Sequence, residues 1–386
     1  KSEPMPAHLI GHQAIERIIE TIGLDRIMDD AIEELTIALA NHNPQTTEIL
    51  PRHGFVYRPP QVGVLEWMPV MHADGAVLVK LVSYNPTNPD QQALPTIMST
   101  MALFDASNGR LQAITDGIVL TAIRTGASSA VASRVLARPD SRVVGLVGCG
   151  AQAVTQLHAL SRVFDIKRVL AFDTDSAAAA SLGERVKWLG LPVEPASPNE
   201  LQTQSDIICT ATTVAPGQGP VIDGQGLKAH VHINAVGSDL PGKTELPLAL
   251  LQAGLVCPDF PEQAAKEGEC QQLPALASQG PSFDVLLQQR ARFEAYQPSL
   301  TVFDSTGFVL ADLVMVRLMQ RYANTLDLGT RMDIEAVASD PKNPYSLQSG
   351  SLSNHLAHQT DANATALAAG LAADLAPDFA SAVTSE

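Results

Sequence analysis

The segment from Arg142 to Asp175 constrains the fold more than any other part of the chain; it reads RVVGLVGCGAQAVTQLHALSRVFDIKRVLAFDTD. It opens with a short apolar run rich in β-branched residues, which is typical of a buried parallel strand. A G-x-G-x-x-A turn and a segment of helical composition, 153–164, come next, and a second apolar run, 169–172, ends at Asp173. This order of strand, turn, helix and strand predicts a βαβ unit of the dinucleotide-binding type.

Each small residue of the turn has a physical role in binding a dinucleotide. Gly148 permits the tight strand-to-helix turn, Gly150 lets the backbone approach a pyrophosphate, and Ala153 lets the helix pack closely on the strand. The N-terminal amides of this helix would point at the phosphates. Glycine pairs also mark ordinary turns, so the alternative interpretation is a βαβ unit without a ligand.

The acidic residue at the end of the second strand bears on the choice of cofactor. Asp173 lies 25 positions after Gly148, close to the ~20 expected for the residue that holds the adenosine ribose. Its carboxylate would accept hydrogen bonds from both ribose hydroxyls of NAD and would repel the 2′-phosphate of NADP. The next residues, Thr174 and Asp175, provide no arginine for such a phosphate. The sequence therefore predicts NAD as the cofactor.

The acidic balance of the chain excludes several classes of partner. The 386 residues carry 41 acidic and 25 basic side chains, a formal net charge of −16, whereas nucleic acids and anionic membranes bind basic surfaces. No apolar run approaches the ~20 residues of a membrane span, and the N-terminal stretch lacks the apolar core of a signal peptide. We therefore expect a globular cytoplasmic protein that binds neither nucleic acid nor membrane.

Cysteine and histidine positions do not indicate a metal centre. The four cysteines show no paired spacing, which favours reduced thiols in a cytoplasmic protein over a disulfide framework or a zinc site. His230 and His232 alternate on one predicted strand, but no third ligand accompanies them. A structural role for both histidines is therefore favoured over metal binding.

Strands and helices are predicted on both sides of the βαβ unit. Before it, the pattern predicts helices over 14–40, with a break near Gly23, and over 118–136, a loop over 84–94, and strands at 54–57, 63–68, 76–83, 96–104 and 111–116. After it, the pattern predicts helices over 177–189 and 312–322, the second of them amphipathic, and strands at 206–210, 230–236, 254–257 and 301–304. Strands separated by helices predict a parallel, doubly wound sheet.

Long motifs along the chain, taken in order, identify a family. They are GVLEWMPV (63–70), LPTIMST (94–100), LTAIRTGASSAVAS (120–133), VGCGAQA (147–153), HINAVGSDLPGKTEL (232–246), EGECQQL (267–273) and TVFDSTGFVLADL (301–313), together with Lys80. From about Arg52 to Tyr322 the chain resembles the ornithine cyclodeaminase/mu-crystallin family. The motif that contains Glu66 and the EGECQQL motif are most similar to the bacterial ornithine and lysine cyclodeaminases, rather than to the mu-crystallin or alanine dehydrogenase branches.

The resemblance implies an α/β protein made of two domains. A Rossmann-type domain with a doubly wound parallel sheet, 126–305, would be inserted in a discontinuous α+β substrate-binding and dimerisation domain, 1–125 and 306–338. The resemblance also implies a homodimer whose substrate domains pair sheet to sheet. We interpret 339–386 as a peripheral C-terminal extension, partly helical because leucines recur there at every fourth position, at Leu367, Leu371 and Leu375.

For function, the resemblance implies NAD-dependent conversion of L-ornithine to L-proline and ammonia. A hydride would leave the α-carbon, the δ-amine of the same molecule would attack the resulting imine, ammonia would depart, and the hydride would return to the cyclic imine. The alternatives are a lysine cyclodeaminase, an amino-acid dehydrogenase or imine reductase of the same fold, and a non-catalytic binding protein like some mu-crystallins. Ornithine and lysine differ by one methylene, worth only ~1–3 kcal/mol in a pocket, so the sequence does not choose between these amino-acid substrates.

The resemblance assigns the carboxylate of the substrate to three cations, Arg52, Lys80 and Arg124. The planar fork of arginine suits a carboxylate, and the small apolar neighbours of Arg124 would make an unpaired charge costly there. The alternatives are an exposed strand end for Lys80 and an ion pair on a helix surface for Arg124. The spacing from the carboxylate anchor to Glu66 differs among family members, so Arg58 is a rival to Arg52.

Two carboxylates are predicted to act on protons and amines. Asp239 directly follows an apolar strand, and such strand ends face the ligand crevice, although a turn cap before Pro241 is the alternative. Glu66 would hold the distal amine, with a solvated strand carboxylate as its alternative. The predicted catalytic residues are Asp239, Glu66 and Lys80, and the further substrate contacts are Thr96 and Met68. The predicted cofactor contacts are Gly148, Gly150, Ala151, Gln152, Asp173, Thr174, Asp175, Thr125, Val236, Gly237 and Ser238.

Overall fold

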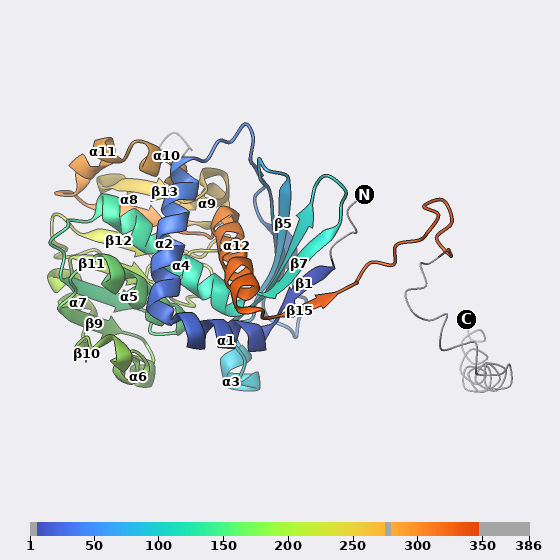
Figure 1. Ribbon diagram of the computed structural model, residues 1–386. Helices are drawn as coiled ribbons and strands as arrows, with labels where there is room; N and C mark the ends of the chain where they lie inside the picture. Colours follow the sequence, from blue (N-terminus) through green and yellow to red (C-terminus); the bar gives the residue numbers. More distant parts are fainter. Residues whose placement is uncertain (1–5, 275–278, 347–386) are drawn as a thin grey trace, which may run out of the picture. The chain divides into compact units, whose positions relative to one another are not determined.

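The computed structural model describes residues 6–274 and 279–346 (Figure 1). The chain divides into two compact units, Lys1–Met332 and Asp333–Glu386. The described part of the second unit, 333–346, contains a turn in which the backbone N–H of Ser339 donates to the carbonyl oxygen of Ser346. The helix expected near Leu367–Leu375 lies outside the described residues. The first unit contains two sheets, which we call sheet A and sheet B.

Sheet A is mixed, and in the described part of the chain it has eight strands. Their order is β15-β1-β7-β6-β5-β4-β2, and β3 also pairs with β4. The pairs are antiparallel, except that β1 and β7 run parallel. The strands are β1 (Ala7–Ile10), β2 (Glu48–Ile49), β3 (His53–Val56), β4 (Val64–Met71), β5 (Ala76–Tyr84), β6 (Ile97–Asp105), β7 (Leu111–Asp116) and β15 (Thr330–Met332).

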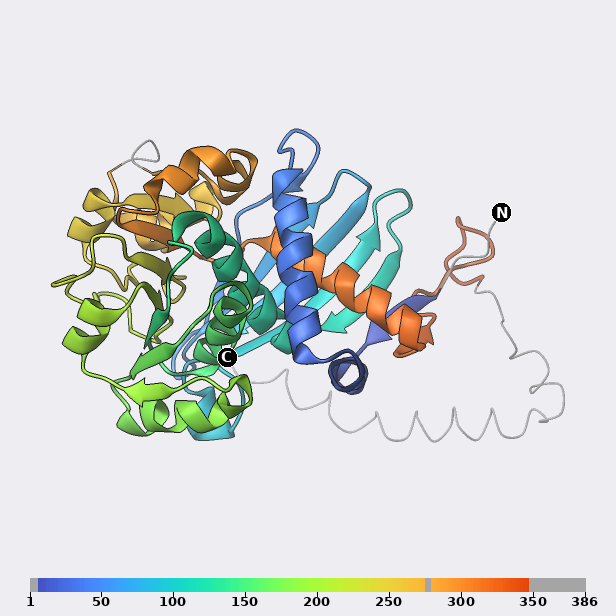
Figure 2. The same ribbon diagram turned by 60° about the vertical axis from the view of Figure 1, so that its left-hand side comes forward.

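Helices cover one face of sheet A, and Figure 2 shows two of them, α2 and α12, crossing that face. Alternation along β5 explains why: Leu78, Lys80 and Val82 are buried, whereas Leu81, which points to the other face, is exposed. The longest helices whose apolar residues contribute to this core are α1 (His12–Ile22), α2 (Leu24–Ala40), α4 (Ile118–Leu136) and α12 (Val309–Leu326).

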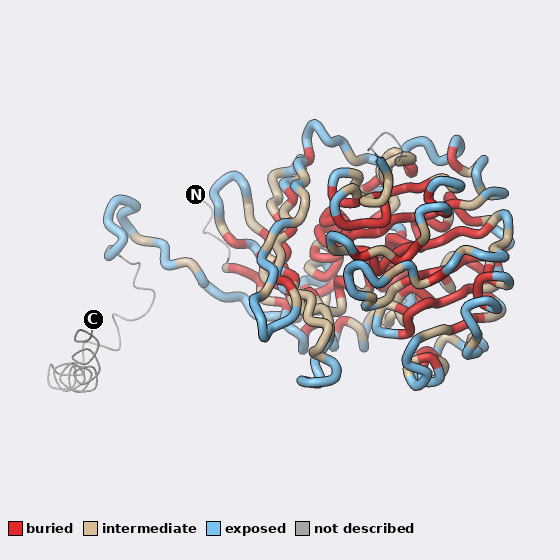
Figure 3. Tube along the Cα trace, turned by 180° about the vertical axis from the view of Figure 1, so that it is seen from behind, coloured by how far each residue is buried: buried red, intermediate tan, exposed pale blue. Residues whose placement is uncertain are grey.

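Sheet B is parallel, with strand order β10-β9-β8-β11-β12-β14-β13 among the residues described. Its central strands are buried along their whole length, which Figure 3 shows as continuous red segments. The strands are β8 (Val143–Val147), β9 (Arg168–Phe172), β10 (Val193–Pro195), β11 (Ile207–Thr210), β12 (His232–Ala235), β13 (Leu255–Pro258) and β14 (Thr301–Asp304). The doubly wound parallel sheet predicted from the sequence is confirmed.

Short helices connect the strands of sheet B. The α-helices are α5 (Ala151–Val163), α6 (Ser176–Arg185), α7 (Pro198–Gln204), α8 (Leu248–Ala253), α9 (Pro261–Glu267), α10 (Phe283–Gln288) and α11 (Arg290–Phe293). Within the described residues, the 3₁₀ turns are Lys187–Leu189, Glu269–Gln272 and Glu294–Tyr296.

Helix α4 joins the two sheets because its small residues allow a close approach. It packs against α5, which follows β8 of sheet B, and against β6 of sheet A. At Gly126, a Cβ atom would lie 2.4 Å from the backbone oxygen of Thr155 in α5, so this contact requires glycine. The alanine- and serine-rich sequence of α4 thus fixes the position of the residues it carries, Arg124 and Thr125, relative to sheet B.

Several predicted elements differ from the structure in ways that have physical causes. The loop predicted over 84–94 contains a short helix, α3 (Asn88–Gln92), whose proline lies in the first turn, where it costs no hydrogen bond. The helix predicted as amphipathic over 312–322 is longer, and it is buried on most sides because it lies between sheet A and α2. Strands β2, β10 and β15 were not predicted, since two or three residues are too few to show a period, and the four-residue strand β1 was also missed.

Among the residues that the structure describes, no helix combines the length and the apolar character needed to cross a membrane.

Candidate functional site

A cleft opens where β8, β9 and β11 end. It has a volume of about 550 Å³, and its lining includes Gly148, Gly150, Asp173 and Thr174. Gly148 has φ +91°, and a Cβ there would lie 2.5 Å from the carbonyl oxygen of Ala211, so glycine is required. At Gly150, the N-cap of α5, no atom lies within 4 Å of the Cβ position, which leaves space for a phosphate in front of the helix. The residues of the cleft therefore fit a dinucleotide.

Backbone amides hold Asp173 in place at the edge of this cleft. Its Oδ2 accepts a hydrogen bond from the N–H of Cys149 at 2.7 Å, and its Oδ1 accepts one from the N–H of Asp175 at 2.9 Å. The side chain of Asp175 instead accepts from the N–H of Ala177 and caps α6. Asp173 is thus the carboxylate on the cleft, and Asp175 has a structural role as a helix cap.

An arginine that the sequence analysis did not consider lies beside the fingerprint turn. Arg185, the last residue of α6, donates from Nη2 to the carbonyl oxygens of Cys149 at 2.6 Å and Ala178 at 3.0 Å. No arginine occupies the two positions after Asp173, but Arg185, twelve residues after Asp173, lies beside the turn because α6 runs back to it. Because its guanidinium is engaged with backbone carbonyls, Arg185 holds the turn to α6.

The other predicted cofactor contacts lie outside the lining of this cleft. Ala151 and Gln152 form the first turn of α5, and the segment 236–238 follows β12. Thr125 donates its hydroxyl to the carbonyl oxygen of Thr121 within α4. Their contact with a cofactor stays a prediction.

Three charged residues that we call the anchor cluster meet at the junction of β5, α4 and α12: Lys80, Arg124 and Asp312. The Nζ of Lys80 lies 2.9 Å, and the Nε of Arg124 3.0 Å, from the same oxygen, Oδ1 of Asp312. The side chains of Lys80 and Asp312 are 0% exposed. Burial, together with the charge of Arg124, lowers the pKa of Lys80 to about 7, which Asp312 opposes.

The anchor cluster resolves two alternatives left open by the sequence. An exposed strand end for Lys80 and a helix-surface ion pair for Arg124 are both wrong, because both side chains are buried. Asp312 was missed, although it is a single aspartate inside the apolar run VLADLVMV, a position where a carboxylate needs partners.

Arg52 lies between two glutamates. Its Nη1 is 3.3 Å from Oε2 of Glu66, and its Nε is 2.7 Å from Oε1 of Glu267. Burial opposes the charge on Arg52, but the carboxylates of Glu267 and Glu66 raise the pKa of its guanidinium above the usual range. The rival, Arg58, is exposed. The structure therefore brings Arg52, and not Arg58, next to Glu66.

Gly307, which precedes α12, brings Arg52 next to the anchor cluster. It has φ +106°, and a Cβ atom there would lie 3.0 Å from Nη2 of Arg52 and 3.3 Å from Nη2 of Arg124. The side chain of Gln263 donates to the carbonyl oxygen of Gly307 and accepts from the backbone N–H of Arg52. Both guanidinium groups therefore lie against one glycine, where a side chain would separate them.

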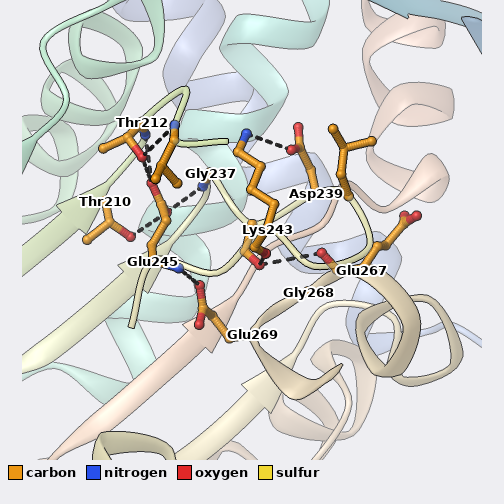
Figure 4. A network of polar contacts seen from close by, with 12 residues as sticks. Thr210, Thr212, Gly237, Asp239, Lys243, Glu245, Glu267, Gly268 and Glu269 are labelled. Carbon is orange, nitrogen blue, oxygen red and sulfur yellow. Dashed lines mark hydrogen bonds and ion pairs between the residues drawn. The ribbon is translucent and has the colours of Figure 1, made fainter. Parts of the chain in front are cut away.

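Asp239 lies in the turn after β12, at the carboxyl end of sheet B. Its Oδ1 is 2.9 Å from the Nζ of Lys243, and Figure 4 shows the Lys243 side chain extending to this carboxylate. Electrostatic effects of Asp239 reach Arg52 and Glu267, where its negative charge raises the pKa of both groups. The sequence analysis considered neither Lys243 nor Glu267, although both lie within the quoted motifs.

Glu267, the last residue of α9, is almost completely buried. Burial raises the pKa of Glu267 to about 7; Arg52 opposes this shift, and the negative charges of Glu66 and Asp239 add to it. We call the group around Arg52 the acidic cluster; it consists of Arg52, Glu66, Asp239, Lys243 and Glu267.

Met68 and Thr96 were predicted to contact the substrate, and the structure places them in different surroundings. Met68 on β4 is buried and lies directly opposite Lys80 on β5. Thr96 is half-buried just before β6, and its carbonyl oxygen accepts from the backbone N–H of Asn85. Within the described chain, no hydrogen bond joins Thr96 to either cluster.

The predicted strand histidines have polar partners. His232 is buried between Thr301 and Asn234, and burial lowers the pKa of its imidazole to about 4. The imidazole of His230 lies 3.3 Å from Asp206. Across 6–274 and 279–346, no group of three or more His, Cys, Asp or Glu side chains could hold a metal ion.

The two clusters have opposite net charge when every group is ionised. The anchor cluster contains two cations and one carboxylate. The acidic cluster contains three carboxylates and two cations. A site of this polarity fits a ligand with a carboxylate at one end and an ammonium group at the other.

Comparison with known proteins shows extended similarity. Residues 13–325 match the sequence profile of the ornithine cyclodeaminase/mu-crystallin family. The chain is 41% identical over 344 residues to the L-lysine cyclodeaminase of Streptomyces rapamycinicus, covering 89% of this chain and 100% of that protein.

Solved structures show the same similarity in three dimensions. A lysine cyclodeaminase, described for its recognition of L-lysine, L-ornithine and L-2,4-diaminobutyric acid, superposes with a TM-score of 0.86 at 45% identity, covering 89% of this chain and 100% of that one. An archaeal alanine dehydrogenase dimer with bound NAD superposes with a TM-score of 0.75 at 28% identity, covering 86% and 100%.

Proposed function

Because the chain belongs to the ornithine cyclodeaminase/mu-crystallin family, we propose that it is an NAD-dependent cyclodeaminase of basic L-amino acids. The first substrate in this proposal is L-lysine, which would be converted to L-pipecolate and ammonia. From the sequence alone, L-ornithine was the first expectation and L-lysine the alternative; the 41% identity to a lysine cyclodeaminase supports the opposite order in this proposal. L-Ornithine stays as a second substrate, because the similar solved enzyme is described as recognising both amino acids.

The observation that carries the proposal is the opposite charge of two adjacent clusters. The anchor cluster would bind the α-carboxylate through Lys80 and Arg124, which lie at one oxygen of Asp312. The acidic cluster, next to it across Gly307, offers carboxylates to a second ammonium group. Alanine, which lacks a distal amine, would leave this side of the site unused.

Gly148, Gly150 and Asp173 would hold the dinucleotide in the cleft at the end of β8. The chemistry that bound NAD supplies is reversible hydride transfer, away from the α-carbon of the substrate at the start and back to the ring carbon at the end. The residues of the chain have the remaining tasks, which are to hold the carboxylate, bring the distal amine to the imine carbon, and move protons. Holding both ends of one substrate makes the ring closure intramolecular, which is a large entropic advantage.

Proton transfer falls to the acidic cluster. The distal amine attacks the imine carbon only when it is neutral, so a proton must leave it after Glu66 has bound its ammonium form. Asp239 is the most exposed carboxylate of the cluster, at 24%, and is the proton acceptor in this proposal. Departing ammonia takes up a proton in turn, so the carboxylate is restored in each cycle.

Product analysis tests the proposal. The purified protein is incubated with NAD⁺ and either L-lysine, L-ornithine or L-alanine, and the products are quantified. We expect equal amounts of cyclic imino acid and ammonia, with no steady accumulation of NADH, and lower activity with NADP⁺. Stoichiometric NADH together with a keto acid, or equal turnover of alanine, would show a dehydrogenase instead.

We also propose a homodimer in which sheet A of one copy faces sheet A of the other. Leu65 and Leu81 on the face of the sheet away from the helices are 37% and 46% exposed, and both line a shallow cavity of about 580 Å³ with Met98 and Ile114. Contiguous apolar residues on an open sheet face are typical of an interaction surface. The similar archaeal alanine dehydrogenase is a dimer.

A further inference from the structure

A tight turn after β12 places Asp239 and Lys243 side by side. The backbone N–H of Lys243 donates to the carbonyl oxygen of Leu240 at 3.0 Å. The carbonyl oxygen of Lys243 accepts from the hydroxyl of Ser238 at 2.6 Å and from the side chain of Gln271 at 3.1 Å. The backbone that carries Lys243 is therefore fixed from inside the turn and from the EGECQQL motif.

The ammonium group of Lys243 is enclosed, whereas its partner faces the site. Its side chain is 2% exposed, and that of Asp239 is 24% exposed. Besides the carboxylate at 2.9 Å, the Nζ lies 5.1 Å from the centre of the Tyr84 ring, at the end of β5. Lysine side chains are almost never fully buried unless they are paired, so the burial of the Lys243 ammonium group calls for a physical explanation.

Electrostatics keep this buried lysine charged. Burial alone disfavours the ammonium form, but Asp239 and Tyr84, followed by Glu245, raise the pKa of Lys243 above its usual value. Glu245 in turn accepts from the backbone N–H groups of Thr212 and Gly237. Lys243 thus lies between a carboxylate on the substrate side and one that shapes the border of the cofactor cleft, of which Thr212 is a lining residue (Figure 4).

The asymmetry of burial argues against a purely structural ion pair. A carboxylate that is 24% exposed needs no buried cation for its own hydration, and burying an ammonium group has a large desolvation cost. A fixed cation behind a carboxylate limits the rotation of that carboxylate, which matters in a reaction that moves protons.

We propose that Lys243 is a positioning residue for Asp239: its buried ammonium group holds this carboxylate in one orientation, directed at the amines of the substrate. The inference rests on the proposed function, in which Asp239 accepts a proton. The charged and titratable groups that face Asp239 are Lys243 from its own turn, Arg52 from the segment before β3, Glu267 from the end of α9 and Tyr84 from β5. Lys243 is the cation in direct contact.

The first test uses Lys243→Met, with Lys243→Arg as the conservative variant. We expect Lys243→Met to lower kcat by about tenfold or more and to leave KM for the amino acid within about twofold, because the carboxylate is still present but is no longer held in place. Lys243→Arg should restore most of the rate, and the dissociation constant for NADH should stay constant. The matched control is Lys228→Met, which removes a lysine paired with Asp206 at 2.6 Å elsewhere on sheet B.

A double-mutant comparison separates positioning from stability. In an Asp239→Asn background, Lys243→Met should cause little further loss of kcat, since the carboxylate that it serves is gone. Losses that multiply in the double variant, or a Lys243→Met variant that keeps its kcat while only its melting temperature falls, would overturn the proposal.

A spectroscopic measurement that needs no turnover distinguishes this inference from the proposed function. In protein labelled with ¹³C at the aspartate carboxyl carbons, the Asp239 signal is identified by its loss in Asp239→Asn. Lys243→Met should change the chemical shift of this signal at constant pH, because the contact at 2.9 Å is lost, and an unchanged signal would refute the inference. If the wild type converts neither lysine nor ornithine, the proposed function fails, and this measurement still decides whether Lys243 holds the Asp239 carboxylate.

Discussion

At the scale of single residues, the site depends on charges whose partners come from distant parts of the sequence. Asp312 accepts hydrogen bonds from Lys80 and Arg124, which are 232 and 188 positions away from it in the sequence. The family motifs predicted both cations as site residues, but no local pattern connects either of them to an aspartate inside an apolar helix. Lys243 and Glu267 were missed for the same reason, because their value lies in contacts that only the folded chain creates.

The buried lysine of the anchor cluster predicts a pH dependence of stability. Burial and Arg124 lower the pKa of Lys80 from 10.5 to about 7. Between these values the unfolded chain binds a proton that the folded chain has released, so the contribution of Lys80 to stability rises with pH across this window and is lost as pH falls through about 7. In urea unfolding, the wild type should therefore gain stability relative to Lys80→Met from pH 7 to pH 9.

The control for this measurement is Lys167→Met, which changes an exposed lysine paired with Asp165. The difference in unfolding free energy between this variant and the wild type should stay flat over the same range. A flat difference for Lys80→Met as well would mean that Lys80 keeps its proton in the folded protein up to alkaline pH.

At the scale of elements, sequence patterns predicted the helices and strands that have a clear local signal and missed the shortest strands. Helix α4 and strand β14 have the predicted bounds, since nineteen residues of helical composition and a β-branched run at a loop boundary are strong local signals. Edge strands such as β2 and β15 have two or three residues and depend on their neighbours in the sheet. The amphipathic interpretation of α12 failed because this helix packs on several sides at once.

The contact between α4 and α5 predicts an effect of a single methyl group. Gly126→Ala would place a Cβ 2.4 Å from the backbone oxygen of Thr155, and backbone cannot move aside cheaply. We expect a loss of about 1–3 kcal/mol in the free energy of unfolding, as in overpacked cores. The control is Gly183→Ala in α6, where the nearest atom lies at 3.7 Å; there, alanine should be neutral or stabilising by up to ~1 kcal/mol. Equal stability of the two variants would contradict the close contact.

At the scale of the whole molecule, the open face of sheet A is the feature that a single copy does not explain. Helices cover the opposite face, which holds Lys80, while Leu65 and Leu81 remain in contact with solvent. The proposed dimer would cover both leucines and shield the strands that carry Glu66 and Lys80.

A charge placed on this face should separate the copies. Leu81→Lys is expected to shift the mass measured by light scattering from dimer to monomer at micromolar concentration, because an unpaired ammonium group is costly in an apolar interface. Ile37→Lys, at an exposed apolar residue on α2, is the matched control and should leave the mass unchanged. A wild-type protein that is monomeric, or a dimer that tolerates Leu81→Lys, would refute pairing through this face.

The glycine contact of α4 also has a mechanical consequence. Arg124 is two residues before Gly126, and at Gly126 there is no clearance between α4 and α5. Helix α4, which bears the proposed carboxylate anchor Arg124, and helix α5, whose N-terminus borders the cleft at the end of β8, are therefore packed as one rigid body at this contact. Mutations intended to admit longer or shorter substrates should consequently be made in the acidic cluster or in the loops near it. The contact between α4 and α5 should be left unchanged.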